Sequence, residues 1–356
     1  MKKNLQCLLM VWGLSLLYTY GQEHKEVLFV DADMLTITGK TMSTSSPYHR
    51  IDTTVVTGIS SSENQQARCS AGLAVAFTTN SSFIDLHPVY KWEHKKDNMT
   101  GIAAAGFDLY IKEDNKWVYA STGAPKVRDS IFTIVANMDT TEKECLLYLP
   151  IYSELEILKI GVQADASIKG TPNPFTLKTV FFGSSFTQGT SASRPGMSYP
   201  MQLQRSLNLD VCNLGFSGNS KLQPYFAEMI AGIDADAFVL DAFSNPNEKM
   251  IRERLIPFLD IIIQRHKTIP IIFVETIHRG NTNFNLKSRD HETRKRKAAR
   301  ELMAGLVQKY KNVYFISNPL PKEASDDTSA DGVHPSDLGY YRWSKTLGSK
   351  LQEILR

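Results

Sequence analysis

The second half of the chain alternates short apolar runs with longer amphipathic segments, and this pattern constrains the fold more than any other sequence feature. The apolar runs are rich in β-branched and aromatic residues, and each is followed by a segment with helical spacing. Consecutive parallel strands need crossover helices, so we predict a doubly wound α/β/α domain with a five-stranded parallel sheet. The predicted strands are 177–182, 210–214, 237–241, 269–275 and 313–316, and the predicted helices are 197–207, 223–231, 248–265, 290–310 and 338–355.

The first half of the chain has a different hydrophobic pattern. Short apolar or alternating runs are separated by Gly, Asn, Asp and Ser, and helical spacing is nearly absent, which predicts a jelly-roll-like β-sandwich. Trp92, Tyr110, Trp117 and Tyr119 could stack on sugar rings, although packing in the sandwich core is the commoner role. The predicted strands are 27–30, 73–77, 107–111, 117–119, 131–135, 145–149 and 155–160.

The sharpest break in composition lies between the two halves, at Gly170-Thr171-Pro172-Asn173-Pro174. Two prolines beside Gly and Asn are typical of a semi-rigid linker. We therefore predict a sandwich domain over 22–169, a linker over 170–176 and an α/β domain over 177–356. If the interface between the domains is small, residues 172–356 should fold alone.

The N-terminus has the features of a secretory signal peptide. Lys2 and Lys3 precede an apolar span over 7–17, and cleavage near Gly21 would remove residues 1–21. The span is too short for a stable membrane anchor, and Cys7 precedes most of it, whereas a lipidated cysteine would follow it. We expect export to the periplasm or the extracellular space.

The remaining cysteines and the charge balance exclude several other classes. Cys69, Cys145 and Cys212 are odd in number and lack metal-site spacing, so their disulfide state stays open. The net charge of +3 is too small to suggest a nucleic-acid partner. The densest basic run, 294–297, lies in a predicted helix that also carries acidic residues, as expected of a solvated helix face. The oligomeric state is not determined by these features.

A cluster of hydroxyl side chains follows the strand 177–182. Gly183 ends the strand, and Ser184, Ser185 and Thr187 come directly after it. Because ligands bind outside the carboxyl ends of parallel strands, Ser185 is a candidate nucleophile. The alternative is that these hydroxyls only cap a helix or form a turn.

A carboxylate and an imidazole stand three residues apart near the other end of the chain, at Asp331 and His334. A serine hydroxyl is a weak nucleophile until an imidazole accepts its proton, and a carboxylate orients that imidazole. Two alternatives remain: Asp331 could cap the last helix with His334 on the surface, or the pair could be half of a metal site. Further ligands are missing nearby, so we predict no metal.

Four segments together resemble the sequence blocks of the SGNH, or GDSL, hydrolase family. The segment Gly183–Gly189 resembles the first block, Asn213–Asn219 the second, Leu240–Asn245 the third and Asp331–His334 the fifth. Four blocks in the family's order are far more specific than any one of them.

The resemblance implies a flavodoxin-like fold and an ester-hydrolysing activity without a cofactor. It also implies a triad of Ser185, His334 and Asp331. The oxyanion hole of the family would correspond to the Ser185 amide, the Gly218 amide and the Asn245 side chain.

Two positions depart from the family pattern, and another segment extends the resemblance. Ser184 and Pro246 stand where the family usually carries Asp, although neither replaced residue performs the chemistry. Gly106–Tyr110, with the sequence GFDLY, resembles the signature of an N-terminal β-domain joined to a bacterial SGNH subfamily.

We therefore expect an exported serine esterase that removes small acyl groups, mainly O-acetyl groups, from carbohydrate. A short-chain lipid esterase or thioesterase is one alternative, and a carbohydrate-binding protein with an inactive hydrolase half is another. His278 follows the strand 269–275 and is a candidate substrate contact.

Overall fold

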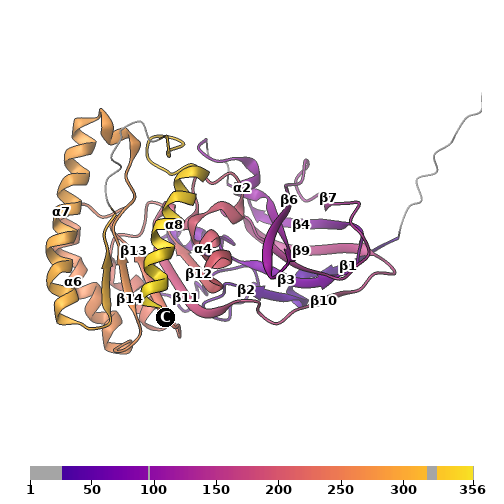
Figure 1. The fold of residues 1–356 in the computed structure, drawn as a ribbon, viewed down its shortest axis with the longest axis horizontal. Helices are drawn as coiled ribbons and strands as arrows, with labels where there is room; N and C mark the ends of the chain where they lie inside the picture. Colours follow the sequence, from indigo (N-terminus) through magenta and orange to yellow (C-terminus); the bar gives the residue numbers. More distant parts are fainter. Residues whose placement is uncertain (1–25, 95–96, 319–326, 356) are drawn as a thin grey trace, which may run out of the picture.

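The computed structural model describes residues 26–94, 97–318 and 327–355. The predicted signal peptide, residues 1–21, lies outside the described residues, so export stays a prediction. Figure 1 shows a β-sandwich at one end of the molecule and an α/β/α unit at the other.

The N-terminal unit consists of two antiparallel sheets, as the sequence predicts. Leu86 and Ile160 of one sheet pack with Val75 and Leu147 of the other in a shared apolar core. One sheet has the order β1 (Val27–Asp31), β9 (Glu154–Gln163), β4 (Ile84–Trp92), β7 (Phe132–Val135). The other has the order β10 (Ile168–Gly170), β3 (Ala74–Thr79), β8 (Lys143–Tyr148), β5 (Phe107–Glu113), β6 (Lys116–Gly123), with β2 (Thr36–Thr38) also paired to β3.

Several elements of this unit were not predicted, and β4 is the most informative. Pro88 argues against a strand because it cannot donate a backbone hydrogen bond. β7 pairs only with Ile84–Leu86, so at Pro88 the strand has a partner on the β9 side alone. The other unpredicted elements are β2, β10, the 3-10 helix η1 (Ala32–Met34), α1 (Ser61–Ala67) and α2 (Gly101–Ala105).

The C-terminal unit has the predicted five-stranded parallel sheet. Its order is β12-β11-β13-β14-β15, which is the flavodoxin-like order. The switch point therefore lies at β11, between its neighbours β12 and β13. The strands are β11 (Thr176–Gly183), β12 (Leu209–Gly215), β13 (Ala237–Asp241), β14 (Ile271–Val274) and β15 (Val313–Ile316).

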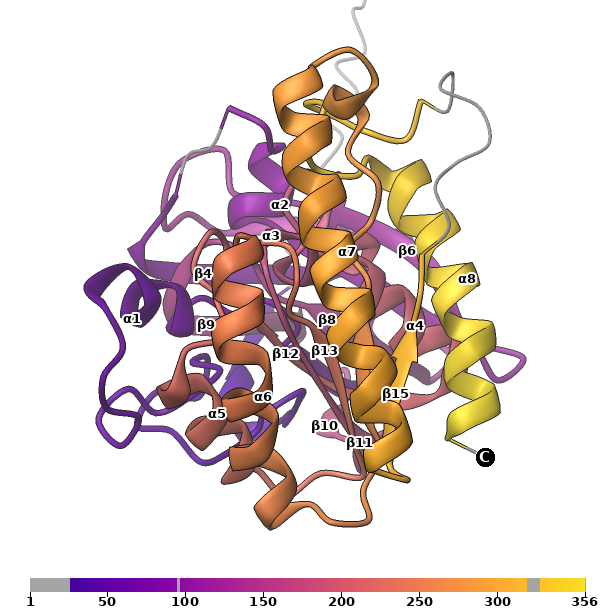
Figure 2. The ribbon, with the colours of Figure 1, turned by 90° about the vertical axis from the view of Figure 1, so that its left-hand side faces the viewer.

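Helices cover both faces of this sheet. Val180 and Phe182 of β11 pack with the helices of one face, whereas Phe181 packs with those of the other. In Figure 2, α6 and α7 lie in front of the sheet. The first face carries α5 (Pro224–Ala231), α6 (Glu248–Arg265) and α7 (Leu286–Lys309), and the second carries α4 (Tyr199–Leu207) and α8 (Asp337–Ile354). Short helices occur at α3 (Ser185–Gln188), η2 (Pro195–Met197) and η3 (Gly280–Asn283).

The two units share their cores. Ile51 and Ala67 pack into the core on the α5–α7 face, and Tyr148 packs into the core on the α4 and α8 face. Tyr148 also donates a hydrogen bond of 2.7 Å to Gln204 of α4. The expectation that residues 172–356 fold alone required a small interface and stays a prediction, but buried apolar residues of both units share core clusters at this interface.

Arg50 makes a buried polar contact across this interface. Its guanidinium donates to the carbonyl oxygens of Asn213 at 3.0 Å and Gly215 at 2.9 Å, both on β12. β12 is an edge strand of the parallel sheet, and edge carbonyls need partners. The N-terminal unit therefore completes the hydrogen bonding of the sheet in the C-terminal unit.

The aromatic residues considered for sugar stacking are mostly engaged within the protein. Tyr110 is buried and packs edge-on against Tyr148 at 5.6 Å between ring centroids. Trp117 packs against Phe175 at 6.1 Å, and the Arg194 guanidinium lies 4.1 Å from the Tyr119 ring centroid. Packing within the protein therefore accounts for Tyr110 and Trp117, whereas Tyr119 stays 46% exposed beside Arg194.

The described residues also bear on membrane and redox chemistry. In those residues, no helix is both long enough and apolar enough to span a bilayer. Cys69, Cys145 and Cys212 are buried, and within the described part of the chain no disulfide joins one of them to another.

Candidate active site

The turn after β11 gives its two serines different roles. The Ser184 hydroxyl accepts a hydrogen bond from the Phe186 amide at 3.2 Å and caps α3. A Cβ atom on Gly183 would lie 2.0 Å from Thr187 Oγ1 and 2.9 Å from the Asp241 carbonyl oxygen, so only glycine fits there. Ser185 then begins α3 at the carboxyl edge of the sheet.

Ser185, His334 and Asp331 form a continuous hydrogen-bonded chain. Ser185 Oγ lies 2.9 Å from His334 Nε2, and His334 Nδ1 lies 2.7 Å from Asp331 Oδ2. If Nδ1 carries the proton, it donates to the carboxylate and leaves Nε2 free to accept from the serine hydroxyl. The structure thus brings together three side chains that the sequence places up to 149 residues apart.

The Asp331 carboxylate is stabilised in its ionised form. Burial acts to raise its pKa, but hydrogen bonds from the Asn98 side chain, the His334 amide and ring, and the Val333 amide outweigh burial. The pKa of Asp331 therefore lies well below its ordinary value. A carboxylate that stays ionised can stabilise a protonated His334 during catalysis.

The helix-capping role considered for Asp331 does not fit this geometry. Ser336, rather than Asp331, caps α8 by accepting from the Gly339 amide at 3.4 Å. Within residues 26–94, 97–318 and 327–355, no group of three or more His, Cys, Asp or Glu side chains could hold a metal ion.

Asn98 is a residue of this site that sequence reasoning missed. Its side-chain nitrogen donates to Asp331 Oδ2 at 2.8 Å and lies 3.3 Å from His334 Nδ1. Asn98 belongs to the N-terminal unit and lies in a polar loop between β4 and α2. The sequence offers no signal for it, because any asparagine in such a loop reads as a turn residue.

The residues expected to form the oxyanion hole lie on neighbouring loops. Gly218 is exposed, has a φ of +75°, and would have open space around a Cβ atom. The Asn245 side-chain oxygen accepts a hydrogen bond from the Ser220 hydroxyl at 3.1 Å, which links the loop after β12 to the loop after β13. The role of Gly218 and Asn245 in catalysis stays a prediction.

A buried charged cluster holds the loop that carries Asn245. Lys295 Nζ donates to the Ser244 carbonyl oxygen at 2.8 Å, and Arg279 donates to the same oxygen at 2.9 Å. Glu292 balances both cations, at 3.0 Å from Lys295 and 3.3 Å from Arg279. Burial lowers the pKa of Lys295 to about 8. Two cations thus fix one peptide carbonyl beside Asn245.

His278 lies in the loop after β14, as expected, and its Nε2 is 3.2 Å from Asn283 Oδ1 of η3. The next residue, Arg279, lies over the Phe186 ring at 5.5 Å, and that ring meets His334 edge-on at 5.5 Å. A direct role for His278 in binding substrate stays a prediction.

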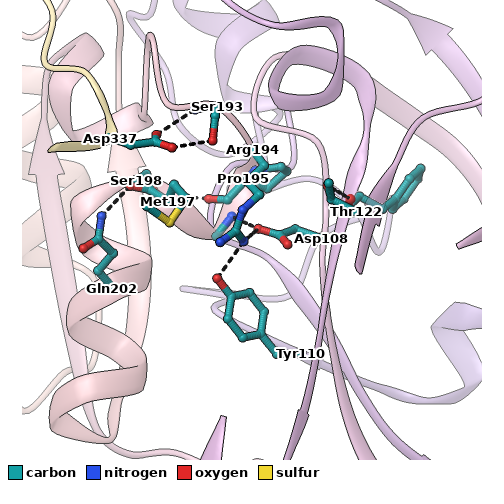
Figure 3. Close-up of polar contacts among 12 residues, drawn as sticks. Asp108, Tyr110, Thr122, Ser193, Arg194, Pro195, Met197, Ser198, Gln202 and Asp337 are labelled. Atoms are coloured by element: carbon teal, nitrogen blue, oxygen red, sulfur yellow. Dashed lines mark hydrogen bonds and ion pairs between the residues drawn. The ribbon is translucent and has the colours of Figure 1, made fainter. Parts of the chain in front are cut away.

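The GFDLY segment joins the two units, as Figure 3 shows for Asp108, Tyr110 and Arg194. Asp108 forms a buried ion pair with Arg194 and accepts from the Gly196 amide at 2.8 Å. Arg194 also donates to the Tyr110 hydroxyl at 2.7 Å. The same loop reaches α8, because the Ser193 amide donates to Asp337 at 2.8 Å. The signature residues of the sandwich therefore secure a loop that follows α3, the helix that begins with Ser185.

Family models match both units of the chain. Residues 176–352 match the GDSL-like lipase/acylhydrolase family, and residues 27–168 match the N-terminus of SGNH-hydrolase-type esterases. No curated protein matches the chain.

Several solved structures match nearly the whole length of this chain. A proposed GDSL-like lipase from Bacteroides ovatus is 42% identical, with 93% of this chain and 98% of that chain covered and a TM-score of 0.89. A salicylyl-acyltransferase from a tetracycline biosynthetic pathway is 18% identical, with 93% and 99% covered and a TM-score of 0.73. A family two carbohydrate esterase from Cellvibrio japonicus is 12% identical, with 93% and 98% covered and a TM-score of 0.60.

The similarities to the acyltransferase and the carbohydrate esterase show the fold alone. The similarity to the GDSL-like lipase shows a relationship that covers both units. The chain therefore belongs to the GDSL-like lipase/acylhydrolase family and is an ester-hydrolysing serine hydrolase with the N-terminal domain of SGNH-type esterases.

Proposed function

We propose that this protein removes small acyl groups, above all O-acetyl groups, from carbohydrate, with Ser185 as the nucleophile. The observation that carries the proposal is the hydrogen-bonded chain from Ser185 Oγ through His334 to Asp331, with distances of 2.9 and 2.7 Å. This is the arrangement that activates a serine hydroxyl for attack on a carbonyl carbon.

The reaction proceeds in two halves. His334 Nε2 takes the Ser185 proton as Oγ attacks the ester carbon, and the resulting oxyanion accepts hydrogen bonds from the Ser185 amide, the Gly218 amide and the Asn245 side chain. His334 then gives the proton to the leaving alcohol as the ester C–O bond breaks. In the second half, His334 takes a proton from water, the hydroxide attacks the acyl-enzyme, and Ser185 leaves with the proton returned by His334.

Three features support the choice of substrate. The loops that carry Gly218 and Asn245 are rich in small and polar residues, which favours a short acyl group. Among the structures with this fold are family two carbohydrate esterases, one of them from Clostridium thermocellum in complex with cellohexaose. The expected signal peptide would place the enzyme where polysaccharides are found.

The test is acetate release from a panel of acetylated polysaccharides by the purified protein, with p-nitrophenyl acetate and octanoate as simple esters and Ser185→Ala as the control. We expect acetate release, faster cleavage of the acetyl than of the octanoyl ester, and no activity in Ser185→Ala. Faster octanoate cleavage would favour a lipid esterase. Cleavage of p-nitrophenyl acetate without release from any polysaccharide would contradict the carbohydrate substrate.

A further inference from the structure

We propose that Asn98, contributed by the N-terminal sandwich, is a positioning residue of the active site that holds the Asp331 carboxylate in line with His334. The proposal rests on the proposed roles of Ser185, His334 and Asp331. It means that the active site is completed across the boundary between the two units.

The hydrogen bonds of Asp331 show what Asn98 adds. Asp331 Oδ1 accepts from the backbone amides of Val333 at 2.9 Å and His334 at 2.7 Å, all within one loop. Oδ2 accepts from His334 Nδ1 at 2.7 Å and from the Asn98 side chain at 2.8 Å. An ionised carboxylate only accepts, so the amide nitrogen of Asn98 must face it. Asn98 is thus the contact that fixes Oδ2 from outside the loop.

The backbone around Asn98 is itself held by the loop that follows α3. The backbone carbonyl oxygen of Asn98 accepts a hydrogen bond of 2.8 Å from the Ser191 hydroxyl. Two residues further along the chain, the Thr100 hydroxyl donates a hydrogen bond to the Ser193 carbonyl oxygen. The same hydroxyl accepts a hydrogen bond of 3.0 Å from the Ala103 amide at the start of α2. Ser191 and Ser193 follow α3, which begins with Ser185. The segment 98–100 therefore bridges the loop of the nucleophile and the loop of Asp331.

The contact also has an electrostatic consequence for His334. The Asn98 N–H group shares the negative charge of Oδ2 with the imidazole, and it lies 3.3 Å from Nδ1. Both effects disfavour the imidazolium, so removal of the Asn98 side chain should favour protonation of His334. The other charged groups near the ring are Asp331, which contacts it directly, and Arg279, which lies over the Phe186 ring that His334 meets edge-on.

Two substitutions separate this role from simple packing. Asn98→Leu removes the donor at similar volume, and Asn98→Asp places a second carboxylate beside the first. Both should raise the pKa of His334, and Asn98→Asp should raise it more, because a like charge near Asp331 favours the imidazolium. Ser191→Ala is the graded comparison, since it removes one hydrogen bond that holds the Asn98 backbone but leaves the side-chain contact with the carboxylate in place.

The experiment uses the full chain. The acid limb of kcat/KM for p-nitrophenyl acetate is measured together with an NMR titration of His334, assigned by the signal lost in His334→Gln. We expect Asn98→Leu to lower kcat/KM by about 10-fold, as for the loss of one charge-assisted hydrogen bond. We also expect its acid limb and its NMR midpoint to move to higher pH, and those of Ser191→Ala to move in the same direction by less.

An unchanged His334 midpoint in both Asn98 variants would overturn the proposal, as would an equal shift in Ser191→Ala. If the wild-type protein cleaves no ester, the proposed function fails instead. The NMR titration would still decide whether Asn98 acts on the Asp331–His334 pair, because it requires no turnover.

Discussion

The Ser220 hydroxyl donates a hydrogen bond of 3.1 Å to the side-chain oxygen of Asn245, and this contact sets which way the Asn245 amide points. With its oxygen engaged, Asn245 presents its nitrogen elsewhere, as an oxyanion donor requires. Pro246 follows and disfavours the helical region for Asn245, so side chain and backbone are both constrained.

Asn245→Ala should therefore lower kcat by about 10²- to 10³-fold, or about 2.7–4 kcal/mol, while KM changes little. Ser220→Ala should lower kcat by about 10-fold, because the Asn245 amide could then flip. Steady-state kinetics and thermal unfolding of both variants provide the check. If Asn245→Ala lost stability and activity in proportion, Asn245 would be a turn residue without a role in the oxyanion hole.

The two adjacent serines give a second prediction. An organophosphonate should modify Ser185, which lies 2.9 Å from His334 Nε2, and Ser185→Ala should abolish the modification. Ser184→Ala should remain reactive with a loss of stability of about 1 kcal/mol, since only a helix cap is removed. Peptide mass spectrometry locates the label. A label on Ser184 in the Ser185→Ala protein would move the nucleophile by one residue.

Lys295 should affect catalysis through the loop that it holds. Lys295→Met removes one of two cations on the Ser244 carbonyl oxygen, so kcat should fall by about 10-fold, as for loss of one hydrogen bond to a charged group. Arg300→Met is the matched control on the same helix. Arg300 pairs with buried Glu275 at 2.7 Å, away from the Ser244 loop. Both variants should lose stability, and only Lys295→Met should lose kcat. If Lys295→Met and Arg300→Met had equal kcat values, Lys295 would have a purely structural role.

Lys295 also predicts a pH dependence of stability. Burial lowers the pKa of Lys295 from 10.5 to about 8, so at a pH between these two values folding releases a proton from this side chain. The unfolded chain then binds more protons, and the contribution of Lys295 to stability must rise with pH across this window. Urea unfolding should show the wild type gaining stability relative to Lys295→Met from pH 8 to pH 10. A constant difference would mean that Lys295 keeps an ordinary pKa.

The shared core predicts that the C-terminal unit does not fold alone. Residues 172–356 without the sandwich would expose the β12 edge that Arg50 covers and the apolar surface that Tyr148 and Ile51 bury. We expect this fragment to be insoluble or inactive, whereas the full chain is soluble. Expression of both, followed by size-exclusion chromatography and an esterase assay, tests this. A soluble and active fragment would show that the interface is dispensable.

The sequence determined the α/β unit because its signals are local. Strand and helix periods repeat along 177–355, and the parallel connection rules leave few topologies for five such repeats. Asp331 and His334 share one short loop, so their pairing could be predicted from spacing and from the family blocks. The seven predicted sandwich strands were also found, since alternation is a local signal as well.

Only the tertiary structure decided the parts that depend on distant contacts. The Asn98–Asp331 contact spans 233 residues and the Arg50–Asn213 contact spans 163, and nothing in either loop's composition identifies its partner. The short helices α1 and α2 are too short to be stable by propensity, so packing across the interface determines them. The sequence thus determined the two units and the three residues of the hydrogen-bonded chain, Ser185, His334 and Asp331. Packing between the units determined which further residues contact this chain, because burial and hydrogen bonding there join segments that have no local signal in common.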